Sequence, residues 1–198
     1  MKTFVATKNL GKLHELRDLF RGTELELDTY PLYAEPVEGE SSYADNAALK
    51  VRALYQQLQQ AGVRGAVIAD DSGLEVAALG GRPGVLSSRY QGPDATWPAR
   101  REALLQELND VPADQREAKF CCAIMLILDS GSEFTSYGEV SGAIAAEEHG
   151  KFGFGYDPIF FYPAANKTFA ELDEDEKNRV SHRGRAAGAL LNLLRARV

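Results

Sequence analysis

Residues 4–16 read FVATKNLGKLHEL, an apolar run followed by a small polar loop and a charged stretch with leucines at helical spacing. This order predicts a buried strand over residues 2–6, a tight turn, and a helix that ends near Gly22. A Gly-Lys turn between a strand and a helix also suggests a phosphate cradle, because helix N-termini attract anions. The Walker pattern is nevertheless absent, since Leu13 follows Lys12 where that pattern needs Ser or Thr.

Apolar strands and amphipathic helices continue to alternate along the rest of the chain. No repeat, low-complexity tract or linker interrupts them, so we expect residues 1–198 to form a single α/β domain. Asp173 and Glu176 have the spacing of a capping box at a helix start. The other expected elements are a strand over 24–29, a helix over 44–61 starting near Ser42, a strand in GAVIADDSGLEV ending at Asp70 and Asp71, a helix over 95–109, a hairpin of 118–128 and 133–140 joined at DSGS, a short strand after KFGFGYDPIFF, and a helical C-terminus with a break near Ser181.

Composition excludes several functional classes. A net charge of -7, with 44% apolar and 26% charged residues, is ordinary for a soluble globular protein and leaves no broad basic surface for nucleic acid. The longest apolar run, residues 121–128, is too short to span a membrane. The N-terminus lacks a secretory pattern, which predicts a cytoplasmic protein. The only cysteines, Cys121 and Cys122, are expected to be buried or half-buried strand thiols.

The polar loop after the first expected strand is a candidate anion site. Thr7 and Asn9 can donate hydrogen bonds to phosphate oxygens, Gly11 allows close approach of the backbone, and Lys12 lies at a helix start. The alternative is an ordinary strand-helix turn, because turns with Gly and Lys are common.

Two adjacent carboxylates follow the apolar run VIA at residues 67–69. Side chains of neighbouring strand residues point to opposite faces, so one of Asp70 and Asp71 can serve a site while the other serves the scaffold. Ligand sites of open α/β folds lie at the carboxyl ends of strands, where we expect this pair. The alternative is a turn in which Asp71 caps the backbone before Ser72 and Gly73.

An acidic loop precedes the second expected helix and contains Glu35, Glu38 and Glu40. Such loops are often only solvated. If this loop folds against Asp71, its carboxylates supply the hard oxygen ligands that magnesium prefers.

The segment FGFGYDP and the residues near the C-terminus complete the candidates. Phe154 or Tyr156 could lie flat against a nucleobase, or both could pack into the core as a buried turn. Lys177, His182 and Arg183 lie on or between the expected terminal helical turns, where cations are usually solvated.

Six motifs occur in a set order: TKNLGK, the acidic loop before SSYADNAALK, ADDSGLEVAALGGRPG, SSRY, FGFGYDPIF and EKNRVSHRG. Together they resemble the inosine triphosphate pyrophosphatase family over nearly the whole chain. The resemblance implies a mixed α/β fold with a long central β-sheet flanked by helices, two lobes with the active site in the cleft between them, and a homodimer. It also implies Mg²⁺-dependent hydrolysis of ITP, dITP and XTP to the nucleoside monophosphate and pyrophosphate, which cleanses the nucleotide pool.

Matching the motifs residue by residue assigns roles. By this resemblance Asp71 is the essential acid, a magnesium ligand and a candidate base for water. Residues 7–12 bind the triphosphate, residues 154–157 hold the nucleoside, and His182 with Arg183 read the purine edge. The implied substrate-binding residues are Thr7, Lys8, Asn9, Leu10, Gly11, Lys12, Lys50, Ser72, Phe154, Gly155, Tyr156, Asp157, Lys177, His182 and Arg183. Of these, Lys50 and Lys177 are assigned to the phosphates.

The chain departs from the family pattern at two places. Lys8 stands where most members have Gly, so its side chain either points outward or adds a cation near the phosphates. The loop EPVEGESS replaces the usual Glu-Thr-Gly form, and we choose Glu38 as the second magnesium ligand by its distance from Asn46.

Two rival interpretations compete with this one. A pyrophosphatase of the related septum-inhibitor family would act on pyrimidine or modified nucleotides, and SHRG and FGFGYDP disfavour it. A catalytically silent nucleotide sensor is disfavoured because Asp71, Lys12 and Lys177 are all retained.

Overall fold

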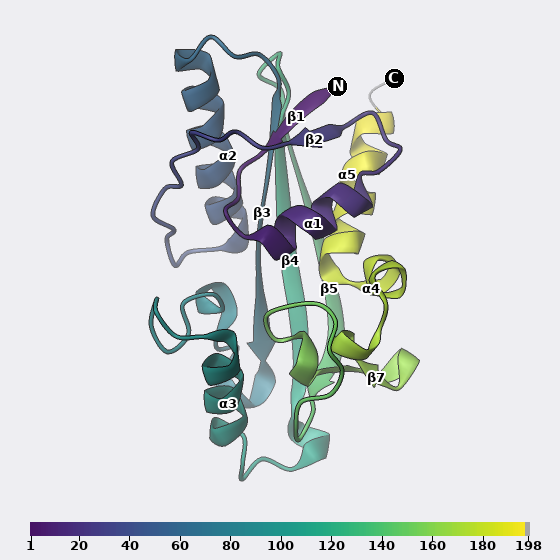
Figure 1. Cartoon of the computed structure of the whole chain (residues 1–198). Coiled ribbons are helices and arrows are strands. Elements are labelled where there is room, and N and C mark those ends of the chain that lie inside the picture. Colours follow the sequence, from purple (N-terminus) through teal and green to yellow (C-terminus); the bar gives the residue numbers. More distant parts are fainter. Residues whose placement is uncertain (197–198) are drawn as a thin grey trace. The chain divides into compact units, whose positions relative to one another are not determined.

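The computed structural model describes residues 1–196, which form a mixed α/β fold (Figure 1). The strands are β1 (Lys2–Val5), β2 (Glu26–Asp28), β3 (Ala66–Val76), β4 (Glu117–Ile127), β5 (Glu133–Ile144), β6 (Phe160–Tyr162) and β7 (Lys167–Thr168). The α-helices are α1 (Leu10–Leu19), α2 (Tyr43–Gln60), α3 (Trp97–Glu107), α4 (Glu174–Val180) and α5 (His182–Arg195). The strands form one sheet in the order β2-β1-β3-β4-β5-β6-β7. The expected fold class is therefore confirmed.

Pairing within the sheet is mixed. β1 pairs in parallel with both β2 and β3, with Phe4 opposite Asp28 and Val67. β6 pairs antiparallel with β5 and β7, with Phe161 opposite Ala143 and Thr168. Among residues 1–196, no helix is long and apolar enough to cross a bilayer.

The chain divides into two compact units, each built from segments that are distant in the sequence. Unit 1 contains Met1–Asp71, Cys122–Gly138 and His182–Val198, and unit 2 contains Ser72–Cys121 and Glu139–Ser181. Two units agree with the two lobes that the resemblance implies. That the whole chain acts as one domain, with its active site in a cleft, stays a prediction.

Unit 1 has three layers, because the strand residues alternate between two apolar clusters. Ile68 of β3 belongs to the cluster that contains Leu16 of α1 and Leu190 of α5. Its neighbour Val67 belongs to the cluster that contains Leu54 of α2. Figure 1 shows α2 on one face of these strands and α1 and α5 on the other. Side chains with a period of two in buried strands produce this sandwich.

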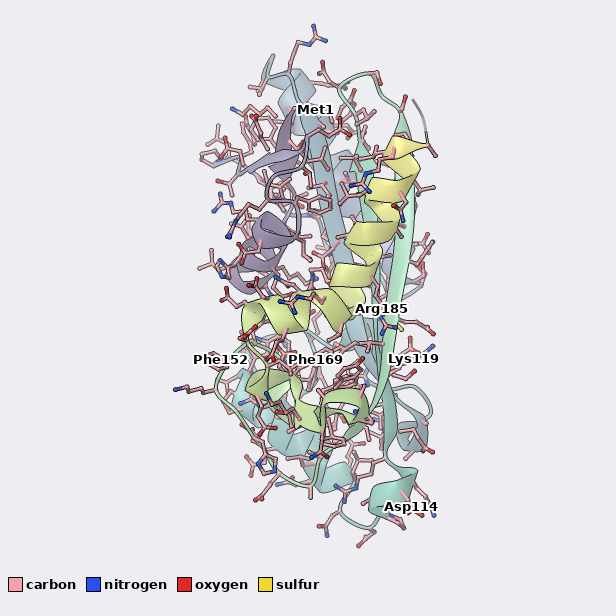
Figure 2. The ribbon with its side chains drawn as sticks, turned by 90° about the vertical axis from the view of Figure 1, so that its right-hand side faces the viewer. Met1, Asp114, Lys119, Phe152, Phe169 and Arg185 are labelled. Carbon is pink, nitrogen blue, oxygen red and sulfur yellow. The ribbon has the colours of Figure 1, made fainter. Side chains whose placement is uncertain are left out.

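Helix α5 lies directly on β5, as Figure 2 shows. A Cβ atom at Gly138 of β5 would lie 2.2 Å from the carbonyl oxygen of His182 and 2.4 Å from the backbone nitrogen of Ala186. Ser136 Oγ also donates a 2.9 Å hydrogen bond to the Ala186 carbonyl. The missing side chain of Gly138 lets the first turn of α5 reach the strand, which fixes where His182 and Arg183 begin.

Unit 2 has an aromatic core. The rings of Phe160 and Phe169 have centroids 4.8 Å apart, and Phe120 lies 4.6 Å from the Phe160 ring. Figure 2 shows Phe169 inside this unit and Phe152 on an outer loop, and Phe152 is 47% exposed. Aromatic side chains bury large areas, so these rings anchor the short strands and 3₁₀ turns around them.

Most expected boundaries are confirmed within a few residues, and the local caps explain them. Ser42 is the N-cap of α2 and accepts a hydrogen bond from the backbone of Asp45. Asp173 and Glu176 form the predicted capping box of α4. α4 and α5 are separated at Ser181, where the helical break was expected.

One expectation is wrong: the strand that contains Asp70 and Asp71 does not end there but continues to Val76. Gly73 indicated a turn, yet it lies within the strand. The residue is a glycine because a Cβ atom there would be 2.1 Å from the Gly84 carbonyl oxygen. The glycine therefore serves close backbone packing. Leu74 follows Gly73 in the strand and is fully buried in the core of unit 2, which stabilises the extended backbone there.

Candidate active site

The loop after β1 is organised by its own side chains. Asn9 is the N-cap of α1, and its Oδ1 accepts a 3.1 Å hydrogen bond from the backbone N–H of Lys12. Thr7 Oγ1 accepts a 3.1 Å hydrogen bond from the backbone N–H of Asn9. Both oxygens stabilise the turn that precedes the helix. Lys8 and Leu10 are exposed. Burial raises the pKa of the Glu35 carboxyl in the acidic loop, and Lys8 lies close enough to counter part of that shift. Both alternatives for the Lys8 side chain stay predictions.

Lys12 extends from the first turn of α1 toward both aspartates of β3. Its Nζ atom lies 3.3 Å from Asp70 Oδ2 and 3.9 Å from Asp71 Oδ1. The lysine side chain is 14% exposed, and those of Asp70 and Asp71 are 0% and 6% exposed. The N-terminal loop therefore delivers its lysine to a largely buried acidic pair, where charge interactions are stronger than in water.

Asp71 is held through both carboxylate oxygens. Lys50 Nζ donates a 3.0 Å hydrogen bond to Oδ1, and Asn46 Nδ2 donates a 3.1 Å hydrogen bond to Oδ2. Lys50 also donates a 2.9 Å hydrogen bond to Glu38 Oε1, and Asn46 binds the backbone of Gly39 through both polar atoms. One face of α2, with Asn46 and Lys50 four residues apart, thus joins the acidic loop to β3.

The charge of Lys50 is stabilised by this surrounding. Burial alone would lower the pKa of its ammonium, but Asp71, Asp70 and Glu38 outweigh that effect and raise the pKa. Lys50 therefore remains a fixed cation between Glu38 and Asp71. The acidic loop does fold against Asp71, as the magnesium hypothesis requires.

Asp70 serves a second, fully buried cluster on the other face of β3. Arg183 donates through Nε (3.1 Å) and Nη2 (2.9 Å) to Asp70 Oδ2, and through Nη1 to Glu15 of α1. Burial alone would raise the pKa of Asp70, but Lys12, Arg183 and Lys50 outweigh it and hold the pKa well below its usual range. Burial alone would lower the pKa of the Arg183 guanidinium, but Asp70 and Glu15 outweigh that effect and raise it. The two aspartates thus divide as the period of two predicts, one to a candidate site and one to a buried ion cluster.

The glycine-aromatic loop in unit 2 is fixed around Asp157. Asp157 Oδ2 accepts a 2.8 Å hydrogen bond from the backbone N–H of Phe154 and also receives the ammonium of Lys177. The Lys177 Nζ atom lies 5.0 Å from the centroid of the Phe154 ring. Phe154 is half-buried, whereas Lys177 and Asp157 are buried. Phe154, Asp157 and Lys177 therefore form one cluster, and Lys177 supports the aromatic loop.

Tyr156 packs into the core, which was the second alternative for this loop. Its ring is 2% exposed and lies edge-on to Trp97, with centroids 5.4 Å apart. Its hydroxyl donates a 3.1 Å hydrogen bond to the carbonyl of Ser87. Tyr156 is thus part of the core of unit 2, and the half-buried Phe154 stays the candidate aromatic side chain of this loop.

The remaining expected residues are placed as follows. Ser72 is half-buried and directly follows Asp71 in β3, and His182 is buried at the first residue of α5. Gly11 is half-buried in the first turn of α1, and Gly155 is buried with a φ of +64°. In unit 1 the structure brings together Lys12, Lys50, Glu38 and Asp71; in unit 2 it brings together Phe154, Asp157 and Lys177.

Sequence reasoning missed Glu15, and it used Asn46 only to measure spacing. Glu15 lies between Leu13 and Leu16 on the buried side of α1, where a carboxylate needs a cationic partner. The position of Glu15 in the sequence therefore indicates a buried ion pair. The partner, Arg183, is 168 positions away, and no local pattern identifies it.

An α/β fold that sets a helix N-terminus, the buried Lys50 and the half-buried Lys12 around a strand carboxylate defines a protein class suited to phosphate-bearing ligands. The sequence model of the Ham1 family matches residues 3–193, and the chain belongs to this family. The family match thus covers both units.

Relatives and solved structures agree with this membership. A dITP/XTP pyrophosphatase of Bacillus cereus is 43% identical over 187 residues, which cover 92% of this chain and 89% of the relative. A dITP/XTP pyrophosphatase of Escherichia coli O157:H7 is 42% identical, with 98% of each chain covered. The HAM1 protein of Coxiella burnetii has a TM-score of 0.84 at 38% identity, with 99% of each chain covered. The Ham1 protein of Staphylococcus aureus has a TM-score of 0.84 at 35% identity, with 100% of each chain covered.

Proposed function

We propose that this chain hydrolyses the non-canonical purine nucleotides ITP, dITP and XTP to the nucleoside monophosphate and pyrophosphate. The proposal rests mainly on the environment of Asp71. This carboxylate is buried and oriented through both oxygens by Lys50 and Asn46, and the Lys12 Nζ atom lies 3.9 Å from its Oδ1. Relatives over 40% identical along nearly the whole chain are named dITP/XTP pyrophosphatases. The enzyme is proposed to act in the cytoplasm as a homodimer.

The donor set of unit 1 fits Mg²⁺. Glu38 and Asp71 place carboxylate oxygens 2.9 Å and 3.0 Å from the same Lys50 ammonium, which therefore holds the two carboxylates close to each other. Asp70 Oδ1 is buried and has no hydrogen-bond partner among residues 1–196. Hard carboxylate oxygens are the ligands that Mg²⁺ prefers. We assign Asp71 and Glu38 as the ligands, and the bound ion supplies charge neutralisation for the triphosphate.

Phosphate binding is assigned to the N-terminal loop and to Lys12, Lys50 and Lys177. A triphosphate carries about four negative charges, which have to be balanced as the leaving pyrophosphate separates. The turn of residues 7–12 offers backbone N–H groups at the start of α1, and Lys12 and Lys50 offer fixed ammonium groups. Because these groups are already ordered by their carboxylate partners, little reorganisation is needed when substrate arrives.

Asp71 is assigned the proton transfer. A carboxylate oriented through both oxygens can accept a proton from a water molecule and aim that water in line with the bond between the α and β phosphates. Lys50 and Asn46 set the direction of its lone pairs. The reaction then needs no covalent intermediate on the protein.

Base recognition is assigned to the aromatic loop and to the start of α5. Phe154 offers a half-buried ring, and Asp157 and Lys177 hold the loop that carries it. His182 and Arg183 are assigned to the purine edge. Inosine and xanthine present an acceptor oxygen at C6 where adenine presents a donor amine, so a site that offers donors disfavours adenine. In the structure the Arg183 guanidinium is buried and donates to Asp70 and Glu15, so its assignment to the purine edge rests on the family resemblance.

The proposal is tested by incubating the purified protein with Mg²⁺ and dITP, XTP, dATP, dGTP or dTTP, and by identifying the phosphate product. We expect pyrophosphate from dITP and XTP and much slower turnover of the standard nucleotides. Orthophosphate as the product, or equal rates with dATP and dITP, would contradict the proposal. Light scattering tests the homodimer.

A further inference from the structure

Arg101 of α3 joins two parts of the chain that flank the glycine-aromatic loop. Its Nε and Nη2 atoms donate to the two carboxylate oxygens of Glu148, at 2.8 Å and 3.0 Å. Its Nη1 atom donates a 2.8 Å hydrogen bond to the backbone carbonyl of Gly155. All three residues belong to unit 2. We propose that Arg101 is a positioning residue for nucleoside binding, an inference that rests on the nucleoside role proposed above for residues 154–157.

The geometry of the contact favours a structural clamp over a loose surface pair. The Arg101 side chain is only 11% exposed, and its planar guanidinium forms a bidentate pair with the carboxylate of Glu148. The third bond goes to a backbone carbonyl, which cannot turn away without moving Gly155. Because the guanidinium is rigid, it fixes the distance between Glu148 and Gly155.

Trp97 strengthens the same support from one helical turn earlier. Trp97 and Arg101 are four residues apart on α3, so they lie on the same face of the helix. A Cβ atom on Gly155 would lie 3.7 Å from the Trp97 ring, and the ring is edge-on to Tyr156. Gly155 adopts a φ of +64°, which L side chains rarely adopt. The loop is thus packed against one side chain and hydrogen-bonded to another from the same helix face.

The consequence concerns Phe154, the residue immediately before Gly155. Its backbone N–H is bound to Asp157, and its successor's carbonyl is bound to Arg101. The backbone is thus held on both sides of the Phe154–Gly155 peptide, and Lys177 Nζ lies 5.0 Å from the ring centroid. The position of the ring is constrained before a base arrives, which lowers the entropic cost of binding. Without Arg101, the nucleoside part of a ligand has to order the loop itself, while the phosphate part is unaffected.

The single tryptophan of the chain makes this testable, because all tryptophan fluorescence comes from Trp97 against this loop. We would titrate wild type and Arg101→Gln with dIMP and, separately, with inorganic pyrophosphate, both in the presence of Mg²⁺. Binding is followed by Trp97 emission and by calorimetry, and dITP turnover gives KM and kcat. Thermal unfolding shows whether each variant is folded.

The matched control is Arg52→Gln, because Arg52 meets Glu133 in the same two-pronged geometry, at 3.2 Å and 2.7 Å, but belongs to unit 1. For Arg101→Gln we expect about tenfold weaker dIMP binding, a similar rise in KM, and unchanged pyrophosphate binding, since the charge-assisted hydrogen bond to the loop at Gly155 is lost together with the two bonds to Glu148. Arg52→Gln should match wild type. Glu148→Gln keeps the bond to Gly155 and should show a smaller effect in the same direction.

Each result has one meaning. Unchanged dIMP affinity and KM in a folded Arg101→Gln protein, or equal losses for dIMP and pyrophosphate, would overturn the positioning role. If wild type hydrolyses none of the nucleotides, the proposed function fails instead, and that outcome is separate because it does not involve the variant.

Discussion

The Nζ atom of Lys50 lies 3.0 Å from Oδ1 of Asp71, and both side chains are buried. A buried ammonium of this kind is tolerated because Asp71, Asp70 and Glu38 surround it. The pair fixes the orientation of the carboxylate that is assigned the chemistry.

Asp71→Asn should fold but lose turnover by about a thousandfold or more, because the amide can neither accept the proton from water nor ligate a metal as a carboxylate does. The side chain keeps its size, so packing around β3 is preserved. Pyrophosphate release measures the activity, and circular dichroism with thermal unfolding measures the fold. Activity near the wild-type level would show that another residue is the base.

Glu38→Gln should raise the Mg²⁺ concentration needed for half-maximal activity by about ten- to hundredfold, because a charged oxygen ligand is lost. Mn²⁺ binding measured by calorimetry should weaken in parallel without substrate. Glu40→Gln is the control, because Glu40 is an exposed carboxylate of the same loop. If both variants respond alike, the loss reflects loop charge and not ligation by Glu38.

Glu15→Gln should lower the free energy of unfolding by about 3 kcal/mol, because it removes one partner from the buried cluster around Arg183. Glu133→Gln makes the same chemical change in an exposed pair with Arg52 and should cost at most about 1 kcal/mol. Urea unfolding of both variants and wild type gives the comparison. Equal costs would mean that the buried cluster adds little to stability.

Two glycine substitutions that touch the α5 layer should have opposite effects. Gly138→Ala would place a Cβ 2.2 Å from the His182 carbonyl oxygen and should destabilise the fold by about 2 kcal/mol or more. Gly188 lies inside α5, where an added Cβ would have no atom of the described residues within 4 Å other than its own helix backbone, and Gly188→Ala should stabilise the helix by about 1 kcal/mol through helix propensity. Thermal unfolding compares them. A neutral Gly138→Ala would mean that α5 can move off β5.

The thiols should react slowly in the folded protein. Burial, with Glu75 nearby, raises the pKa of Cys121 from 9.0 to about 12, and burial also raises the pKa of Cys122. At pH 9 the thiolate fraction of Cys121 then falls from about half to about a thousandth. Because the folded state holds the proton more tightly, this contribution to stability is complete below pH 9 and is lost as the pH rises toward 12.

Ellman's reagent at pH 9, with and without denaturant, measures this difference. We expect slow labelling of the native protein and fast labelling of both thiols after unfolding. Cys121→Ser separates the two signals. Native labelling as fast as that of the unfolded chain would show that the cysteines are accessible thiolates.

Local features of this fold could be predicted from the sequence, and non-local ones could not. Leucines at helical spacing identified α1, and the capping box at Asp173 located the start of α4. Gly73 misled because a strand glycine and a turn glycine look alike, and its reason lies in the backbone of Gly84. Side-chain alternation correctly predicted that Asp70 and Asp71 point to different partners, Arg183 for Asp70 and Asn46 and Lys50 for Asp71.

The candidate site shows the same division. Lys12, Asp71 and Glu38 could be proposed from motifs, and they do come together in unit 1. The pairing of Arg183 with Glu15 and the contact of Arg101 with Gly155 join residues distant in the sequence, so no spacing rule finds them. The packing of Tyr156 into the core was one of two open alternatives, and only the fold could choose.

The segmented composition of unit 1 has a consequence for biosynthesis. Its first 71 residues leave the ribosome early, but Arg183 and the rest of α5 are translated after all of unit 2. Until then, Glu15 and Asp70 lack their guanidinium partner, and burying their carboxylates would carry a large desolvation free energy. A nascent chain interrupted before residue 182 would therefore expose to proteases an incomplete core that α5 completes.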